Sequence, residues 1–341
     1  MSNKTTINDI AKAAGVSIST VDRVVNRRGS VSPAAEAKVV EWARRLNLDR
    51  HIYRNHLRQL RIAVMMQSPN NPFYEELRDT FNELNHSLAE RRVTNFLHYI
   101  DVTDTKATRT RINEISRSYD GLIIVAPNEP SLADALRGVA NNIAIITMVT
   151  DIPNCGRISY VGPDNRQMGR VAGELMGRFL GPSGGELIIV LGMFRLAGHE
   201  EREMGFRSVL RDHFPTCNIA VVLETEEDAG RAGELVSLAL RDQPQVKGIY
   251  NLSAGNSAIS TAIQRMGLAT KITFITHELT PNRRQLLRDG ILDAVIDQNP
   301  RLEAQRALET LEHHFHRSAV DPRFPHYTPF DIYIRENCPD P

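Results

Sequence analysis

The stretch TTINDIAKAAGVSISTVDRVVNRRG, residues 5–29, predicts two short helices joined by a tight turn. Thr6 and Asp9 form an N-terminal capping pair for a first helix, which runs to about residue 14 and ends at Gly15. Ser17 is placed to cap a second helix. This order of signals is typical of a helix-turn-helix unit.

The second helix has one apolar side and one polar side. The apolar side carries valines at helical spacing, which are Val21, Val24 and Val25. A third helix begins at Ser32 and Pro33 and supplies an apolar floor from Val39, Val40, Ala43 and Leu46. We therefore expect a three-helix head over residues 1–48.

The polar side of the second helix is predicted to lie in a major groove of DNA. The candidate base contacts are Ile18, Ser19 and Arg23, and the candidate backbone contacts are Thr20, Asn26 and Arg28. The alternative is an ordinary helical hairpin with a solvated polar face. Charge favours DNA, because Lys and Arg outnumber Asp and Glu in residues 1–61 while the rest of the chain has the opposite excess, for a formal net charge of zero.

Length and composition predict more than one domain. The chain has 341 residues, and a hydrophobic content of 41% is ample for a large core beyond the head. No secretory signal begins the sequence and no apolar run is long enough for a membrane, so we expect a cytoplasmic protein. Cys155, Cys217 and Cys338 lie far apart without metal-ligand spacing, which favours reduced thiols.

The body after a polar, basic linker at residues 49–60 alternates short apolar runs with amphipathic stretches. Such alternation predicts parallel strands with crossover helices, and it occurs twice. We expect an α/β fold of two doubly wound parallel-sheet lobes, with a ligand cleft at the carboxyl ends of the strands. The expected boundaries are 61–341 for the body, about 61–160 with 291–320 for lobe 1, and about 161–290 with 321–341 for lobe 2.

The chain resembles transcriptional regulators of the lactose-repressor family, whose body is similar to periplasmic sugar-binding proteins of type I. The matching segments include INDIAKAAGVSISTVDRVVN in the head, NNPFY at 70–74, YVGPDNRQMGRVAGELM at 160–176, EREMGF at 201–206 and AVIDQNP at 294–300. This resemblance implies a homodimer that binds a palindromic operator, with a small-molecule effector in the cleft. It also implies a repressor rather than an enzyme.

The predicted ligand site combines flat aromatic faces with forked polar groups, which suit a polyhydroxylated ring. The candidates are Asn71, Phe73, Tyr74, Asp151, Asn165, Arg202, Asn251, Glu278 and Gln298. Each also has a structural explanation: core packing for the aromatics, a surface ion pair for Arg202, a turn for Asn251. The family more often has aspartate at Glu278, and the longer side chain could suit a smaller ligand or bring the neighbouring His277 into contact.

Two departures from the family stand in the head and linker. The linker lacks a proline, and Leu57 is the one plausible minor-groove wedge. Asp22 replaces a frequent serine, and a local pair with Arg23 is the favoured explanation.

Other functions have less support. A purine-like corepressor would need stacking on both faces, yet the single tryptophan, Trp42, lies in the head, so a sugar or polyol is favoured. A solute-binding protein would need a secretory signal and no basic head. The histidines at 313, 314 and 316 lack partners at metal-ligand spacing, and no catalytic motif orders a nucleophile and base, so we expect neither metal, cofactor nor catalysis.

Overall fold

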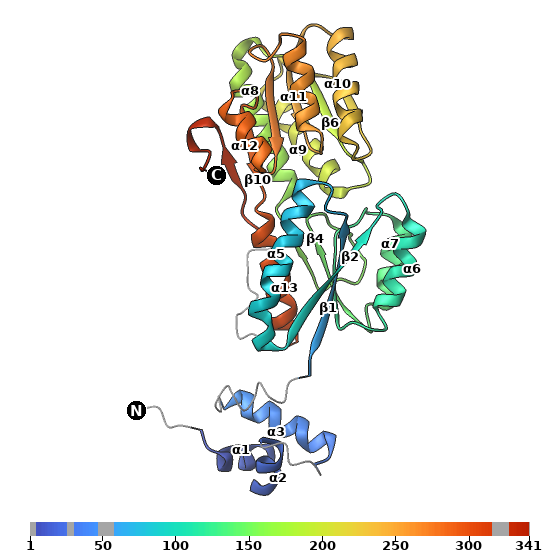
Figure 1. Ribbon diagram of the computed structural model, residues 1–341, viewed down its shortest axis with the longest axis vertical. Helices are drawn as coiled ribbons and strands as arrows, with labels where there is room; N and C mark the ends of the chain where they lie inside the picture. Colours follow the sequence, from blue (N-terminus) through green and yellow to red (C-terminus); the bar gives the residue numbers. More distant parts are fainter. Residues whose placement is uncertain (1–4, 26–30, 47–57, 316–326, 341) are drawn as a thin grey trace. The chain divides into compact units, whose positions relative to one another are not determined.

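The computed structural model describes residues 5–25, 31–46, 58–315 and 327–340. The chain forms two compact units: residues 1–61 with 84–94, and residues 62–83 with 95–341 (Figure 1). The predicted DNA contacts Asn26, Arg28 and Leu57 lie outside the described residues.

The head consists of α1 (Ile7–Ala14), α2 (Ile18–Val25) and α3 (Pro33–Arg45). The predicted capping box is confirmed, since Thr6 N–H donates to Asp9 Oδ2 at 2.9 Å and Asp9 N–H to Thr6 Oγ1 at 3.3 Å. Gly15 ends α1 with a φ of 63°, and Ser17 Oγ accepts from Thr20 N–H at 3.0 Å at the start of α2.

A small aliphatic core holds these helices together. Its buried members come from all three helices and are Ile10, Ala11, Ala14, Val21, Val24, Val39 and Ala43. A core of this size stabilises a short domain only marginally, so each of its larger side chains matters.

The first sheet of the body has five strands in the order β2-β1-β3-β4-β5. Their bounds are β1 Leu60–Gln67, β2 Val93–Ile100, β3 Gly121–Ile124, β4 Ala144–Met148 and β5 Ser159–Val161. The pairs formed by β1, β3, β4 and β5 are parallel, as the alternation of strands and helices predicts.

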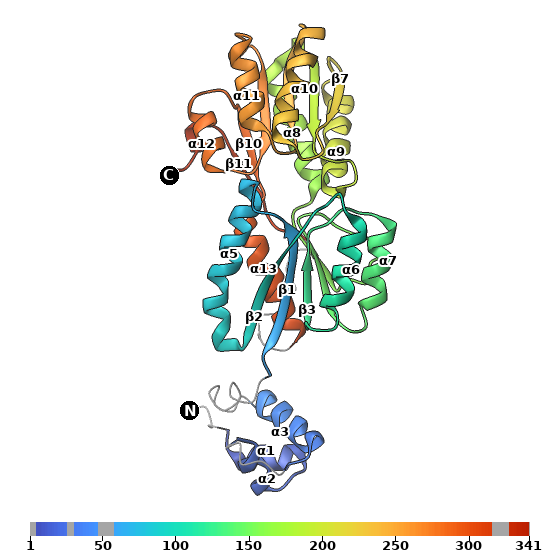
Figure 2. The same ribbon diagram turned by 45° about the vertical axis from the view of Figure 1, so that its right-hand side comes forward.

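Helices cover both faces of this sheet. Figures 1 and 2 show α5 and α13 side by side on one face and α6 and α7 on the other. Their bounds are α5 Pro72–Leu88, α6 Thr105–Ile115, α7 Pro130–Val139 and α13 Pro300–His314.

The second sheet has six strands in the order β11-β10-β9-β8-β6-β7, and β11 is antiparallel to β10. The strands are β6 Gly185–Leu191, β7 Cys217–Glu224, β8 Val246–Asn251, β9 Thr273–His277, β10 Ala294–Asp297 and β11 Asp331–Tyr333. The helices are α8 Asn165–Leu180, α9 Ala197–His213, α10 Ala229–Asp242, α11 Asn256–Arg265 and α12 Pro281–Arg288. Because β10 pairs with β9, the assignment of all of 291–320 to lobe 1 is wrong: the chain returns to the first sheet only with α13.

Three short 3-10 turns complete the described structure, at Ala89–Arg91, Gly181–Ser183 and Arg335–Asn337. The three cysteines are free thiols. Among the helices of the described residues, none has the length and apolar character that a membrane crossing requires.

Candidate functional site

The outer side of α2 presents short polar groups beside one aliphatic group. Ile18 is 54% exposed, and Ser19 and Arg23 are also exposed. Thr20 is half-buried, and its hydroxyl lies 2.8 Å from the Ser17 hydroxyl at the first turn. A side chain with an aliphatic tip can contact a thymine methyl, and an arginine fork can bond to guanine, so this surface has the groups that base recognition requires.

A buried cavity of about 50 Å³, here called the inner cavity, lies in the body at the carboxyl ends of strands from both sheets. Its lining residues are Asn71, Phe73, Tyr74, Val125, Val149, Thr150, Leu196, Gly198, His199, Arg202, Glu227, Leu252, Ser253, Ala254, Glu278 and Gln298. Six of the nine predicted ligand residues are among them. The structure brings together Asn71, Phe73, Tyr74, Arg202, Glu278 and Gln298.

Arg202 on α9 connects two elements that are distant in sequence. Its Nε donates to Asn165 Oδ1 and its Nη2 to Gln298 Oε1, both at 2.7 Å, and its side chain is almost fully buried. The helix is held close to α8, since a Cβ added at Gly169 would lie 1.9 Å from the Arg202 carbonyl oxygen. The guanidinium is therefore held in one orientation. An exposed ion pair on the surface, the structural alternative for Arg202, would leave it free to move.

Glu278 follows β9 and is held between two arginines. Its Oε2 lies 3.1 Å from Arg283 Nη1, and its Oε1 lies 3.7 Å from Arg202 Nη1. The carbonyl oxygen of Glu278 also accepts from Arg283 Nη1, at 3.2 Å. These contacts hold the carboxylate in one orientation beside the cavity.

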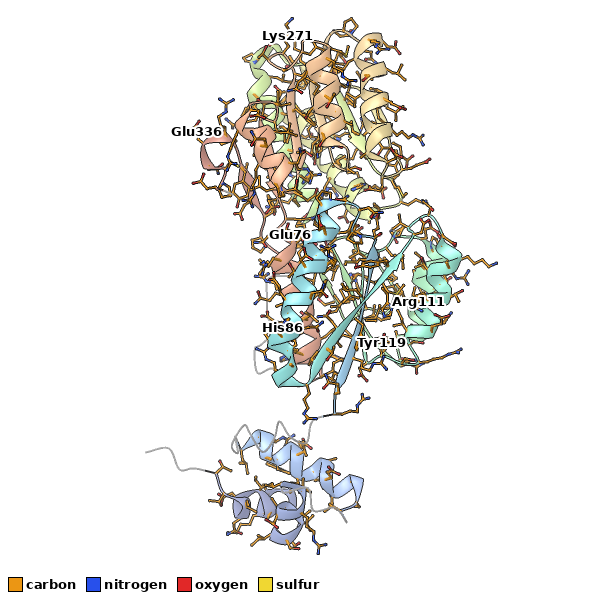
Figure 3. All side chains as sticks on the ribbon, viewed as in Figure 1. Glu76, His86, Arg111, Tyr119, Lys271 and Glu336 are labelled. Carbon is orange, nitrogen blue, oxygen red and sulfur yellow. The ribbon has the colours of Figure 1, made fainter. Side chains whose placement is uncertain are left out.

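Two aromatic rings begin α5. Phe73 and Tyr74 are buried and pack edge to face, with ring centroids 5.2 Å apart. Asn71 Oδ1 accepts from Phe73 N–H at 3.0 Å and so fixes the start of the helix next to the cavity. Figure 3 labels Glu76, two residues beyond Tyr74, and thereby marks the end of α5 that carries the pair.

His199 and Glu227 also line the inner cavity, and the sequence analysis missed both. Burial lowers the pKa of His199 to about 3, and the positive charge of Arg202 acts in the same direction, so the ring is neutral. Burial raises the pKa of Glu227 to about 7, and the negative charge of Glu278 adds to this. Glu227 lies three residues after β7, where the rule for parallel strand ends could have found it, whereas His199 lies inside α9 and no strand-end signal marks it.

Three lining residues have backbone conformations that non-glycine residues rarely adopt. The φ angles are 66° at Val149, 64° at Glu227 and 54° at Glu278. Positive φ costs of order 1 to 3 kcal/mol for each such residue and is most unfavourable for β-branched valine. Strain concentrated around one cavity is typical of a ligand site.

A larger cavity of about 780 Å³, here called the outer cavity, adjoins the inner one. The two share Asn71, Glu227 and Ala254. The outer cavity also has Asp101, Glu226 and Arg283 in its lining. Asn71 and Glu227 thus stand where the two spaces meet.

Asp151 and Asn165 line a third cavity, of about 710 Å³, and not the inner one. Arg157 donates to both Asp151 oxygens at 2.6 Å, and Thr147 Oγ1 donates to Oδ1 at 2.7 Å. Although burial opposes it, the hydrogen bonds from Arg157 and Thr147 lower the pKa of Asp151. These bonds use lone pairs that a ligand at Asp151 would otherwise need.

Asn251 lines none of these three cavities. Its amide nitrogen donates to the carbonyl oxygens of Ser253 and Ala254 at 3.1 and 3.2 Å, and its Oδ1 accepts from Ser253 N–H. It serves the turn after β8, so the structure does not place it with the predicted ligand residues around the inner cavity.

His277 does not reach a ligand position. It is fully buried, and its Nε2 lies 2.7 Å from Tyr250 Oη. Burial and the nearby Arg202 hold the pKa of His277 well below its usual value. The prediction that the longer Glu278 side chain would bring His277 into contact is therefore wrong.

No group of three or more His, Cys, Asp or Glu residues within the described part of the chain is arranged to hold a metal ion.

Two family matches together span most of the chain. Residues 62–315 match the periplasmic binding protein domain, and residues 6–49 match the lacI family of bacterial regulatory proteins. The division between the matches follows the change in sequence character that separates the basic head from the α/β body.

Individual proteins are similar in the same way. The HTH-type transcriptional regulator DegA of Bacillus subtilis is 26% identical over 267 residues, which cover 76% of this chain and 77% of DegA. The maltose regulon regulatory protein MalI of Escherichia coli is 28% identical over 255 residues, covering 73% and 72%. The structure of GanP, a glucose-galactose binding protein from Geobacillus stearothermophilus, matches with a TM-score of 0.74 at 18% identity over 83% of this chain and 100% of GanP, a likeness of fold.

Proposed function

We propose that this chain, which belongs to the lacI family of bacterial regulatory proteins and contains a periplasmic binding protein domain, changes its affinity for an operator when a small sugar or polyol enters the inner cavity. It is a DNA-binding transcriptional regulator with a sugar-binding-like domain, and not an enzyme. The operator is palindromic, and the protein binds it as a homodimer, probing two half-sites with two copies of α2. The protein acts in the cytoplasm, where bacterial DNA lies.

One observation carries the sugar proposal: a fixed guanidinium, a carboxylate and an amide converge beside two aromatic rings. Arg202 can donate through Nη1, which Asn165 and Gln298 do not use, Glu278 accepts, and Gln298 and Asn71 do both, so adjacent hydroxyl groups find complementary partners. Phe73 and Tyr74 can cover the C–H face of a ring. The names of MalI and GanP, which refer to maltose and to glucose and galactose, agree with this class.

The switch rests on a difference in affinity between two conformations. Lining residues of the inner cavity come from both sheets, so a bound ligand favours the arrangement of lobes in which they converge. A coupling of about 1 to 3 kcal/mol between the effector and the operator corresponds to a change of roughly 5- to 150-fold in DNA affinity.

Two measurements on the full chain test the proposal. Selection from randomised duplexes should return a palindrome, and fluorescence anisotropy should then report a change in operator affinity with one member of a panel of pentoses, hexoses, inositols and nucleobases. Uniform, salt-sensitive binding to every duplex would remove the operator proposal. A response to nucleobases but not to sugars would replace the sugar proposal with a purine-like corepressor.

A further inference from the structure

Glu227 is a carboxylate that, among the described residues, forms no ion pair with an arginine or a lysine. Its side chain is 14% exposed, and its Oε1 accepts from Ser253 Oγ at 3.3 Å. Among the described residues, His199 alone comes within ion-pair range, with Nδ1 at 3.8 Å from Oε1. That nitrogen accepts from Met193 N–H at 3.4 Å, so the neutral ring places its proton on Nε2 and gives Oε1 no hydrogen bond from Nδ1.

The nearby arginines are committed to other partners. Arg202 donates to Asn165 and Gln298. Arg283 pairs with Glu278. When the Asn256 amide is oriented so that its oxygen and its nitrogen both have partners, its oxygen accepts from Arg283 Nε at 2.6 Å and from Nη2 at 2.9 Å. Neither guanidinium forms an ion pair with Glu227, and the positive charge of Arg283 acts on it only from a longer distance.

The backbone around Glu227 is nevertheless in an unfavourable conformation that positions this carboxylate. Glu227 has a φ of 64°, a conformation unfavourable for glutamate. A Cβ added at Gly192 would lie 1.5 Å from Glu227 Oε1, so a glycine makes room for the carboxylate. A charged group that is strained, buried and only weakly hydrogen-bonded is expensive unless a ligand supplies its partner.

The outer cavity, which leads to Glu227, has an excess of negative groups. Its charged lining residues are the carboxylates of Asp101, Glu226 and Glu227 and the guanidinium of Arg283. Arg231 Nη1 pairs with Glu226 at 2.9 Å from outside this lining. A confined space with this balance attracts positive charge.

We propose that the effector carries a cationic amino group that pairs with Glu227, and that it is an amino sugar or an amino polyol. This inference rests on the proposed function of the inner cavity and names the ligand class. The hydroxyl groups bind among Arg202, Glu278 and Gln298, and the ammonium lies where the inner and outer cavities meet. Glu227 is then the residue that selects an amine over the parent sugar.

Affinity for the amine depends on pH through Glu227. The groups that face it are Tyr74 from α5, His199 and Arg202 from α9, Ser253 after β8, and Glu278 and Arg283 around α12. Tyr74 and His199 are neutral across the working range, because burial raises the pKa of Tyr74 and lowers that of His199. Burial raises the pKa of Glu227 to about 7, so below that pH most Glu227 side chains are protonated. An ammonium pairs with the carboxylate form, whose population falls as the pH falls. Amine affinity should fall by up to about tenfold per pH unit below that value.

Matched ligands test the inference on the full chain. Calorimetry compares glucosamine, galactosamine and mannosamine with their parent hexoses and N-acetyl derivatives, and glucamine with sorbitol. At least one amine should bind about tenfold or more tightly than its neutral parent, which corresponds to about 1.4 kcal/mol. Glu227→Gln should abolish that preference, whereas Glu234→Gln, an exposed carboxylate on α10 outside all three cavities, should retain it.

The outcomes separate this inference from the proposed function. If neutral sugars bind and no amine has an advantage, or if the preference survives Glu227→Gln, the role of Glu227 is wrong and the sugar effector stands. If no sugar, polyol or amino derivative binds, both proposals are wrong. Since Gln is nearly isosteric with Glu, thermal unfolding of the variant shows whether a lost preference reflects misfolding.

Discussion

The three-helix head and the inner cavity are stabilised by contacts of very different range along the chain. The head's caps join residues three apart, Thr6 with Asp9 and Ser17 with Thr20. In the cavity, Arg202 binds Asn165 and Gln298, which are 37 and 96 residues away. A substitution at a cap of the head therefore disturbs only one helix end, whereas a substitution in the cavity disturbs several elements at once.

A second difference lies in the burial of charge. The core of the head is aliphatic, while the inner cavity buries guanidinium and carboxylate groups together. Removing one member of a buried charged set leaves the others without partners, so the cavity should be more sensitive to single substitutions than the head.

The largest expected effect is that of Arg202→Ala. The variant leaves Asn165 Oδ1 and Gln298 Oε1 without their donor, and we expect the free energy of unfolding of the body to fall by about 3 to 5 kcal/mol, with loss of the effector response. Denaturant unfolding and ligand titration measure these losses. Operator binding by the folded variant should remain, since the head is not altered.

Arg211→Ala is the matched control on the same helix. Its side chain is 76% exposed and pairs with Asp212, which is 43% exposed, so the cost should stay below about 1 kcal/mol. Equal losses of unfolding free energy in the two variants would contradict the view that the hydrogen bonds of Arg202 with Asn165 and Gln298 stabilise the body.

Glu227→Gln should have a smaller effect that depends on pH. Because the folded-state pKa is raised from 4.5 to about 7, folding favours the protonated form: Glu227 costs nothing below pH 4.5, and the cost grows as pH rises to 7. The variant should therefore gain up to on the order of 3 kcal/mol over the wild type across that window, in the absence of ligand. Urea unfolding at several pH values measures the difference, and a gain independent of pH would refute the assignment.

Arg23→Ala tests the head alone. If Arg23 reads a base, operator discrimination should fall by about 1 to 3 kcal/mol while the effector affinity stays unchanged. Competition between operator and scrambled duplex measures it. Lys38→Ala, exposed on α3, controls for loss of positive charge, and an equal effect there would indicate phosphate contact only.

The smallest effect is expected for Thr6→Ala. Loss of the cap should destabilise the head by about 1 kcal/mol, seen as a lower melting temperature of α1 and weaker DNA binding at elevated temperature. Asn8→Ala, at an exposed position inside α1, should change little. A large loss of effector binding in Thr6→Ala would contradict the expectation that substitutions in the head leave the inner cavity unaffected.

The same contrast explains what could be predicted from the sequence. Capping, glycine termination and valine spacing act within a few residues, so the bounds of α1 and α2 followed directly. The alternation of strands and helices likewise predicted two parallel sheets. The pairing of β10 with β9 depends on where the chain crosses between lobes, and no local pattern marks that point.

The site was predicted less completely for a related reason. A polar residue after a strand can serve a ligand or its own turn. Asn251 and Asn71 look alike in sequence, yet of the two only Asn71 lines the inner cavity. Asp151 lies apart from the inner cavity, and Arg157, six residues on, donates to both of its oxygens. Glu227 and His199 were missed because Glu227 belongs to an acidic stretch that looks solvated in sequence, and His199 lies inside α9 with no local pattern that places it at a cavity.

The small size of the inner cavity has a kinetic consequence. About 50 Å³ holds only a few water molecules, far less than the roughly 300 Å³ or more of a typical ligand pocket. An incoming molecule must wait for the lobes to part, so the observed binding rate should level off at high ligand concentration at the rate of opening. Release would be limited by the same opening step. The complex would then persist through short falls in ligand concentration, for a time set by the rate of lobe opening rather than by the affinity alone.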